Sequence, residues 1–231
     1  MGKINRWTLM IPRFCAYGFL KNLRFFEVFL ILFLRQKGLS FLEIGTLIGI
    51  REMTAMILEV PTGIVADLIG RRKAMIMAFL SYIFSFLFYY AAKSFLWFLP
   101  AVILFGVGDA LRSGTHKAMI LEYLDLRGLS DKKVEVYGRT RSWSQIGSAL
   151  STVIAAVLVF YKGDYGIVFL ASLIPYLLDL ALMISYPREL DGKTSGHLSL
   201  RVVLDFTLHS FRNCWRVKPL RTALLNSYLD K

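Results

Sequence analysis

Six long apolar stretches run through the sequence, and they restrict the possible folds more than any other feature. A helix needs about 20 mostly apolar residues to cross the hydrocarbon core of a bilayer, and its backbone groups must bond within the segment. The chain is 56% hydrophobic and 19% charged, whereas soluble domains are roughly 45–50% apolar and 25% charged. We therefore predict an all-α, polytopic membrane protein. The predicted spans are residues 14–34, 41–67, 74–92, 95–123, 138–161 and 166–186.

The net charge of +12 is explained mostly by the topology of these spans. On a soluble protein, this surplus would suggest binding to nucleic acid. Here the basic residues gather in the N-terminus, in loops 70–73 and 125–137 and in the tail from residue 187, whereas the opposite side holds only Arg35, Lys37, Lys93 and Lys162. By the positive-inside rule, both ends of the six-span unit should face the cytoplasm. We expect a multi-pass protein of the cell membrane with no nucleic-acid partner.

The spans divide the chain into four predicted segments. Residues 1–13 form a cytoplasmic N-terminus, and residues 14–186 form the transmembrane bundle. Residues 187–218 form a cytoplasmic linker, whose apolar residues have the spacing of an amphipathic helix on the membrane surface. Its apolar positions are Leu200, Val203, Leu204, Leu208, Phe211 and Trp215. Residues 219–231 are similar to the start of a seventh span but are too few to cross a bilayer.

Two of the spans carry charged residues at helical spacing. The first contains Arg24 and Glu27, and the fourth contains Asp109, Arg112 and His116 at i, i+3 and i+7. These spacings place the side chains of each span on one helix face. A charge at mid-membrane costs roughly 2.5–3.5 kcal/mol, so such residues should face a cavity or a partner. We expect all five to line a substrate and proton cavity, with Glu27 and Asp109 as the protonatable groups. For His116, the alternative is a histidine that only satisfies a buried neighbour.

Further charged residues suggest an intramembrane charge network. Its predicted members are Arg51, Glu52, Glu59, Arg141 and Asp179. Cations and anions within the six spans are nearly equal in number, which favours mutual pairing inside the bundle. Ion pairs that only lock helices together are the simpler interpretation of Glu52, Glu59 and Asp179. The spacing Gly45-x-x-x-Gly49 in the second span predicts close packing against another helix.

A glycine and arginine pattern lies between the second and third spans. Gly63, Asp67, Gly70, Arg71 and Arg72 form G-x-x-x-D-x-x-G-R-R. Asp67 stands at a helix end, where it can accept backbone hydrogen bonds and pair with the arginines, and Gly70 permits a tight turn. The pattern, joined to six spans with both ends inside, resembles the signature of the major facilitator superfamily of secondary transporters. We expect this gating loop to act as a latch that forms in one conformation and breaks in another.

The resemblance implies the plan of a larger transporter. Members have about twelve spans in two halves, and this chain is similar to the N-terminal half, a 3+3 inverted repeat, plus the start of span seven. In the family, spans one and four line the cavity, spans two and five gate it, and the loop stabilises the outward-open state. Gly114 follows Arg112 too closely for the family's span-four arginine motif, and span five, which includes Arg141, lacks the Gly-Pro pair of drug/proton antiporters. Efflux by antiport is therefore not indicated.

These observations predict a secondary active transporter, or its N-terminal half, that moves a small solute by alternating access with protons as the expected coupling ion. No enzyme, cofactor or metal is expected, because H-E-x-x-H, G-x-S-x-G and Walker-type patterns are absent from the sequence. The second wall of the cavity would come from a second six-helix half, either a C-terminal half or a second copy. The alternative is a non-transporting truncated half or an assembly partner. Substrate and transport direction stay open.

Overall fold

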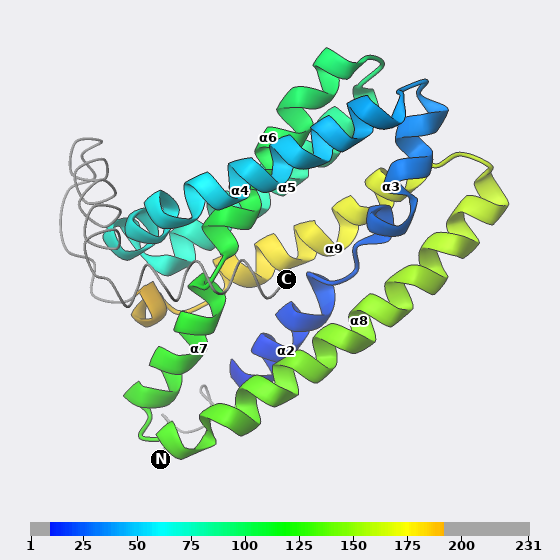
Figure 1. Ribbon diagram of the computed structural model, residues 1–231. Helices are drawn as coiled ribbons and strands as arrows, with labels where there is room; N and C mark the ends of the chain where they lie inside the picture. Colours follow the sequence, from blue (N-terminus) through cyan, green and yellow to red (C-terminus); the bar gives the residue numbers. More distant parts are fainter. Residues whose placement is uncertain (1–9, 192–231) are drawn as a thin grey trace, which may run out of the picture.

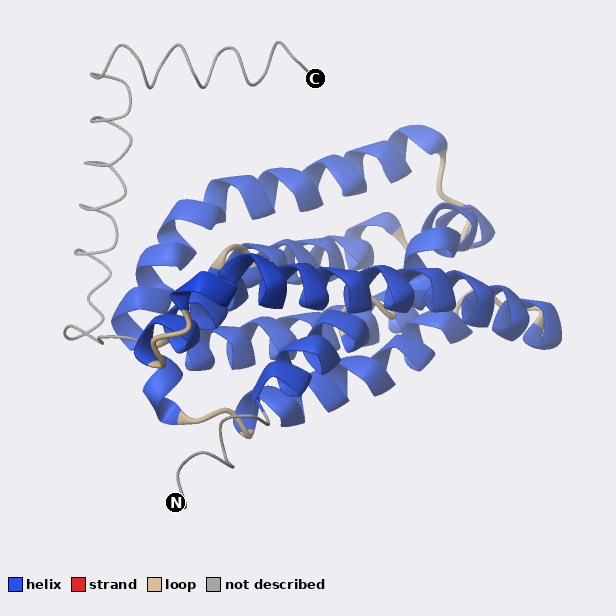
Figure 2. Ribbon diagram, turned by 90° about the horizontal axis from the view of Figure 1, so that it is seen from below, coloured by secondary structure: helices blue, strands red, loops and turns tan. Residues whose placement is uncertain are grey.

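The computed structural model describes residues 10–191, and every regular element in this range is a helix (Figure 1). The helices are α2 (Met10–Leu20), α3 (Phe25–Gln36), α4 (Phe41–Ile69), α5 (Arg71–Ala91), α6 (Phe95–Arg112), α7 (Thr115–Leu126), α8 (Lys133–Lys162) and α9 (Ile167–Ile184). Two short 3₁₀ helices cover Ser130–Lys132 (η1) and Arg188–Asp191 (η2). Most of the predicted N-terminus, the predicted amphipathic helix and the predicted seventh span lie outside the described residues. The all-α class is confirmed, with no strand between residues 10 and 191 (Figure 2).

The first and fourth predicted spans are each interrupted, so the prediction of one continuous helix is wrong for both. In the first, α2 ends at Leu20 and α3 begins at Phe25, and Asn22 donates its side-chain amide to the Gly18 carbonyl at 2.9 Å. In the fourth, Ser113 and Gly114 separate α6 from α7, and Gly114 has a φ of +70°. A left-handed residue cannot continue a right-handed helix, and glycine takes this conformation without steric cost.

Four helical segments among the described residues are long and apolar enough to cross a membrane. They are Arg71–Ala91, Phe95–Leu126, Ser130–Lys162 and Ile167–Ile184, with mean hydropathy between 1.6 and 2.3. Helix α4 is also long, with 29 residues, but charged side chains interrupt its apolar sequence, among them Arg51, Glu52 and Glu59. Helices α2 and α3 have 11 and 12 residues, so neither spans alone. Arg51, Glu52 and Glu59 of α4 line the cavity described below, and so do Lys21 and Arg24 of the α2–α3 break.

The packing of the helices follows an inverted repeat. The first span (α2 and α3) packs against the fifth (α8) and the sixth (α9), and the fourth span (α6 and α7) packs through α6 against the second (α4) and the third (α5). In an inverted repeat, spans one, two and three correspond to spans four, five and six. The contacts of span one with five and six therefore correspond to the contacts of span four with two and three. The contact between α5 and α9 joins the two repeats. These pairs lie side by side in Figure 1, and they confirm the 3+3 arrangement.

Glycines mark where the helices of these pairs come closest. A Cβ on Gly18 of α2 would lie 2.7 Å from the Thr140 carbonyl oxygen of α8, and one on Gly106 of α6 would lie 2.8 Å from the Arg51 carbonyl oxygen of α4. Each glycine precedes the arginine of its span, Arg24 or Arg112, by six residues. The first and fourth spans, which are equivalent in the two repeats, therefore each have a close-contact glycine six residues before an arginine.

The predicted close packing at Gly45 and Gly49 is wrong for the part of the chain that the structure describes. A Cβ on either residue would meet no atom within 4 Å. The spacing of two glycines permits a close approach but does not say which helix face is occupied. In α4 that approach occurs elsewhere, at Arg51 opposite Gly106.

Candidate functional site

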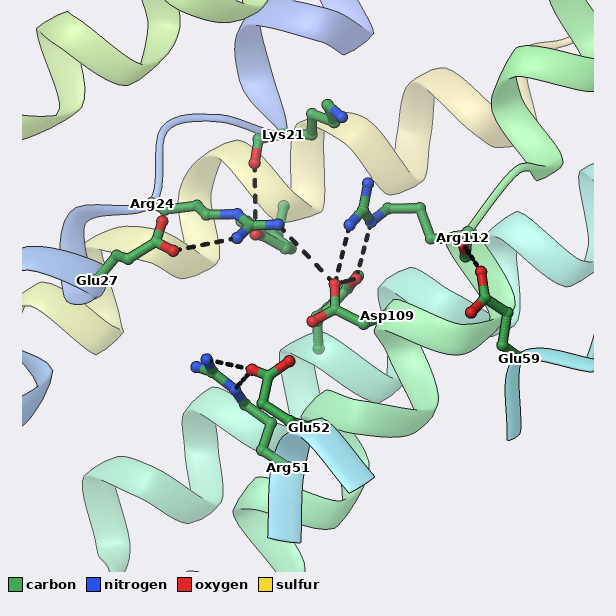
Figure 3. A network of polar contacts seen from close by, with 11 residues as sticks. Lys21, Arg24, Glu27, Arg51, Glu52, Glu59, Asp109 and Arg112 are labelled. Atoms are coloured by element: carbon green, nitrogen blue, oxygen red, sulfur yellow. Dashed lines mark hydrogen bonds and ion pairs between the residues drawn. The ribbon is translucent and has the colours of Figure 1, made fainter. Parts of the chain in front are cut away.

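A charged cavity of about 630 Å³ lies between the two interrupted spans and α4. Its lining includes the charged side chains of Lys21, Arg24, Glu27, Arg51, Glu52, Glu59, Asp109, Arg112 and Lys117. Figure 3 shows Arg24 and Glu27 on one side, Asp109 and Arg112 on another, Arg51 and Glu52 of α4 below them, and Glu59 of α4 beside Arg112. The first and fourth spans both contribute residues to the lining of this cavity. A cavity with so many charges inside an apolar bundle is suited to a polar solute rather than an apolar one.

Asp109 is the centre of the hydrogen-bond network in this cavity. Its Oδ1 accepts the Tyr82 hydroxyl at 2.6 Å and Nη2 of Arg112 at 2.9 Å, and Nη2 of Arg24 lies 3.9 Å away. Arg112 also donates its Nε to the Tyr82 hydroxyl at 2.9 Å. Asp109 and Arg112 are on α6 and Arg24 precedes α3, so the carboxylate links the two interrupted spans (Figure 3). Two arginines and a tyrosine stabilise its charged form.

Glu27 lies at the outer side of the same network. Its Oε1 is 3.4 Å from Nη1 of Arg24, and its side chain is 56% exposed, against 24% for Asp109. Arg24 occupies the N-cap position of α3 rather than a helical position. The break in the span therefore allows one guanidinium to reach both Glu27 and Asp109.

Helix α4 supplies a second row of charges. Arg51 pairs with its neighbour Glu52 at 2.7 Å and lies over the Phe105 ring, 5.4 Å from its centroid. Two turns later, Glu59 accepts the Ser113 hydroxyl at 2.6 Å, and Ser113 belongs to the break between α6 and α7. The acidic groups of α4 thus reach both the cavity and the second break.

His116 lies at the cavity wall but not as part of one helical stripe with Asp109 and Arg112. The break at Ser113 and Gly114 places His116 on α7, and its ring stacks on Tyr17 with 3.6 Å between centroids. Its side chain is buried, and its Nε2 has no hydrogen-bond partner among the described residues. The prediction of a single helical face is therefore wrong, although all three residues border the same cavity.

Two members of the predicted charge network are not paired in the described part of the chain. Arg141 is exposed on α8 and forms no ion pair with a described residue. Asp179 of α9 is fully buried, and neither carboxylate oxygen has a hydrogen-bond partner there. The prediction of mutual pairing is wrong for these two, because nearly equal numbers of charges do not ensure that cations and anions lie within reach of one another.

The gating loop is a junction of one residue. Helix α4 ends at Ile69 and α5 begins at Arg71, and Gly70 between them has a φ of +104°. Arg71 pairs with Asp67 at 3.5 Å and with Glu122 of α7. The ion pair to Glu122 connects the second and third spans to the fourth at this end of the bundle.

The second arginine of the signature binds a different group. The backbone amide of Arg72 donates to Oδ1 of Asp191 at 3.0 Å, and its Nη1 donates to the carbonyls of Ile184 and Tyr186 at 3.2 and 3.1 Å. A Cβ on Gly70 would lie 2.7 Å from the same Asp191 oxygen. Arg72 therefore holds the end of α9 rather than Asp67. Gly63 lies within α4, and a Cβ there would meet nothing within 4 Å.

Sequence reasoning missed three residues of this arrangement: Tyr82, Ser113 and Asp191. Tyr82 is one of many aromatic residues in the apolar spans, so nothing in its pattern separated it from the core. Ser113 became available because the helix breaks beside it. Asp191 had a usable signal, since a carboxylate close after the sixth span lies on the same side as the basic gating loop.

Among residues 10–191, no group of three or more His, Cys, Asp or Glu side chains is placed to hold a metal ion. The fold and the cavity together define a polytopic membrane protein with a charged cavity between interrupted spans. The family model of the Major Facilitator Superfamily matches residues 13–227, and the chain belongs to this superfamily.

Comparison with curated protein sequences finds no match. Among solved structures, 23 chains match. One is described as the crystal structure of a POT family transporter in complex with thioalcohol conjugated peptide, and it has a TM-score of 0.60 and 16% sequence identity to this chain. The match covers 97% of this chain and 46% of the other, so this chain spans about half the length of that transporter.

Proposed function

We propose that this chain forms one half of a secondary active transporter that works by alternating access, as a transporter and not an enzyme. The observation that carries the proposal is the charged cavity between two interrupted spans of an inverted repeat. Irregular backbone at membrane depth is tolerated where it lines a cavity, and binding sites of such transporters lie where the repeats meet. We place the protein in the cell membrane with both ends of the six-span unit in the cytoplasm.

The transported solute is proposed to be small, polar and at least partly anionic. Most cavity cations are neutralised by a carboxylate, but Lys21 and Lys117 have no acidic partner among the described residues and lie over the rings of Tyr17 and Tyr137. An acidic group on the solute would supply the missing counter-charge. Amino acids, dicarboxylates and short peptides are the first solutes to test.

Asp109 and Glu27 are proposed as proton-coupling carboxylates. Asp109 contacts both arginines of the interrupted spans, so protonation of its carboxyl would weaken the link between the two spans. Such a change gives the two conformations different proton affinities, which is the requirement for coupling.

The central test measures proton flux in proteoliposomes that contain the full chain and a pH-sensitive dye, with those three solute classes as probes. At least one should drive proton movement, and Asp109→Asn should abolish it while the protein still inserts. Asp125→Asn is the matched control, because Asp125 lies outside the cavity and pairs with Lys133 at 2.6 Å. Unchanged flux in Asp109→Asn would reject its coupling role. No flux from the inserted wild-type chain with any probe would favour the non-transporting alternative.

The gating junction is proposed to act as a latch. Asp67, Arg71 and Glu122 connect three spans at one end of the bundle, and breaking these ion pairs would free that end to move. Asp67→Asn should lower turnover more than it weakens solute binding, measured as kcat against KM for the solute identified above. An unaltered turnover rate would count against the latch.

A second six-helix half is proposed to complete the cavity. Helix α8 has a polar, exposed stripe that continues from the cavity residue Tyr137 through Arg141, Gln145, Ser148 and Thr152. These residues share one face at helical spacing, and most exposed apolar residues of α8, such as Ile146 and Val153, lie on the opposite face. Polar side chains do not face lipid without a penalty, so the stripe should face a partner half or the water between the halves.

A further inference from the structure

Asp179 stands apart from the cavity network and has no explanation in the proposed transport cycle. It lies on α9 with a relative exposure of 0%. Neither carboxylate oxygen has a hydrogen-bond partner within residues 10–191, and no cation there lies within ion-pair distance. An ionised carboxylate in such a place is very costly, and a buried group of this kind usually becomes neutral instead.

The charged groups that face Asp179 are Lys21, in the break after α2, and Arg112, at the end of α6. Arg112 is already bound to Asp109 and Tyr82. Lys21 forms no ion pair with a described residue, and apart from Asp179 its charged neighbours are the cations Arg24, Arg112 and Arg141. The ammonium of Lys21 would therefore gain by moving toward a carboxylate.

Titratable hydroxyl and imidazole groups complete the surroundings of Asp179. Those that face it are Tyr17 of α2, Tyr176 of α9 and Tyr186 after α9. In the next layer, Tyr82 of α5 contacts the Tyr176 ring, and His116 of α7 stacks on Tyr17. The Tyr17 hydroxyl and His116 Nε2, like Asp179, are buried without a hydrogen-bond partner in the described chain. Tyr17, Lys21 and His116 all border the cavity, whereas Asp179 does not. Asp179 is thus one side-chain layer behind the cavity wall.

We propose that Asp179 is a proton-binding site: it holds its proton in this conformation and releases it to the cavity when the Lys21 ammonium moves within ion-pair distance. In that step the O–H bond of the carboxylic acid breaks, the proton passes to water in the cavity, and the ammonium balances the charge of the new carboxylate. Asp109 differs because its two arginines and Tyr82 stabilise the ionised form. The use of this proton in transport rests on the proposed function, but the protonation of Asp179 does not.

The test is infrared spectroscopy of the full chain in lipid vesicles at neutral pH, with and without ¹³C-labelled aspartate. The wild type should show a carboxylic acid C=O band that the label shifts, which assigns the band to aspartate without any variant. Asp179→Asn should lose this band, and Asp109→Asn, a cavity carboxylate in the same bundle, should keep it. A wild type without the band, or a band lost in Asp109→Asn instead, would overturn the proposal.

Lys21→Met tests the counter-charge. If Lys21 stabilises the carboxylate that forms on release, the band in Lys21→Met should persist to a higher pH than in wild type. If Lys21→Met shows the band at neutral pH and the wild type does not, Asp179 is already ionised and paired in the native protein, which contradicts the proposal. If the band has the same pH dependence in wild type and in Lys21→Met, Lys21 does not stabilise the carboxylate, and this part of the proposal is wrong. These measurements need no solute and no transport, so their outcome is separate from that of the proposed function.

Discussion

Tyr82 is the least expected residue of the cavity, because its hydroxyl joins the two charged groups at the cavity's centre. It donates to Asp109 at 2.6 Å and accepts from Nε of Arg112 at 2.9 Å, and the rest of its side chain is buried. A single neutral hydroxyl therefore sets the relative position of a carboxylate and a guanidinium. Arg112 also binds Asp109 directly, so the three groups form a closed triangle of hydrogen bonds.

Removing this hydroxyl should loosen the triangle. We expect Tyr82→Phe to lower the free energy of unfolding by about 1 kcal/mol, the usual size of such a bond inside membrane proteins. Thermal unfolding in detergent measures the change. Tyr90→Phe on the same helix is the control, because Tyr90 is 47% exposed. Equal melting temperatures for Tyr82→Phe and Tyr90→Phe would show that the hydroxyl contributes nothing to stability.

At the gating junction, the adjacent cations Arg72 and Lys73 allow a test variant and a control variant to be compared. Arg72 binds two carbonyls at the end of α9 and a carboxylate of η2, whereas Lys73 is exposed. Arg72→Gln should increase hydrogen exchange of residues 184–191, because it removes the side-chain bonds to Ile184 and Tyr186. Lys73→Gln should leave exchange there unchanged. Similar exchange in both variants would contradict the role given to Arg72.

The sequence indicated the charged residues of the cavity but not their partners. A charge within an apolar span is costly unless it faces a cavity or a partner, and this cost marked Arg24, Glu27, Asp109 and Arg112 as candidates. All four border one cavity. The pairing of Asp109 with Tyr82 depends on the approach of α5 to α6, which no spacing along the chain encodes. Asp179 was selected for the same reason as the others, but its isolation appears only in three dimensions.

The breaks in the first and fourth spans are the elements that build the cavity. In each, an arginine stands at the break, Arg24 before α3 and Arg112 at the end of α6, so both guanidinium groups reach the same carboxylate. The first break has a sequence signal, since Lys21, Asn22 and Arg24 put three polar residues within four positions. The second has only Ser113 and Gly114, which occur in many continuous membrane helices.

Close contact between α2 and α8 should depend on Gly147. A Cβ there would overlap the backbone carbonyl of Phe19, and backbone cannot move aside cheaply. We expect Gly147→Ala to lower the free energy of unfolding by about 1–3 kcal/mol. Gly138→Ala on the same helix is the control, since its Cβ would meet nothing within 4 Å. That control should be neutral or stabilising by up to about 1 kcal/mol, and destabilisation of equal size in both would reject the packing argument.

Two glycines of the gating signature should respond differently to alanine. Gly70 has a φ of +104° and lies against Asp191, so Gly70→Ala should cost about 1–3 kcal/mol in backbone strain alone. Gly63→Ala should be tolerated, because the residue is helical and its Cβ would be free. Melting temperatures of the two variants, compared with wild type, check this. If Gly63→Ala is destabilised and Gly70→Ala is not, the conclusion that Gly70 requires glycine and Gly63 does not would be wrong.

The complete bundle combines an apolar outer surface with polar surfaces that must not contact lipid. The fold class followed from the six apolar stretches, and the superfamily followed from the signature between spans two and three, which the family match confirms. What the sequence could not provide was the direction each polar face takes. The stripe on α8 became visible only once its buried face against α2 was known.

Labelling of single cysteines should separate the two exposed faces of α8. Ser148→Cys lies on the polar stripe and should react with a membrane-impermeant maleimide in native membranes, from one side of the membrane or the other. Val153→Cys is on the apolar face, where Val153 is 62% exposed, and should stay unlabelled because it faces lipid. The reverse pattern would mean that the stripe does not face water or a partner half.

The interruption of the first span also affects how the protein enters the membrane. This span is synthesised first, but its packing partners α8 and α9 follow only after the helices of the second, third and fourth spans. Until they arrive, neither α2 nor α3 is long enough to cross the bilayer alone, and the polar residues between them have no protein environment. Stable insertion of the first span is therefore completed only after translation of the sixth, so a ribosome stalled within α8 would leave the first span only partly integrated.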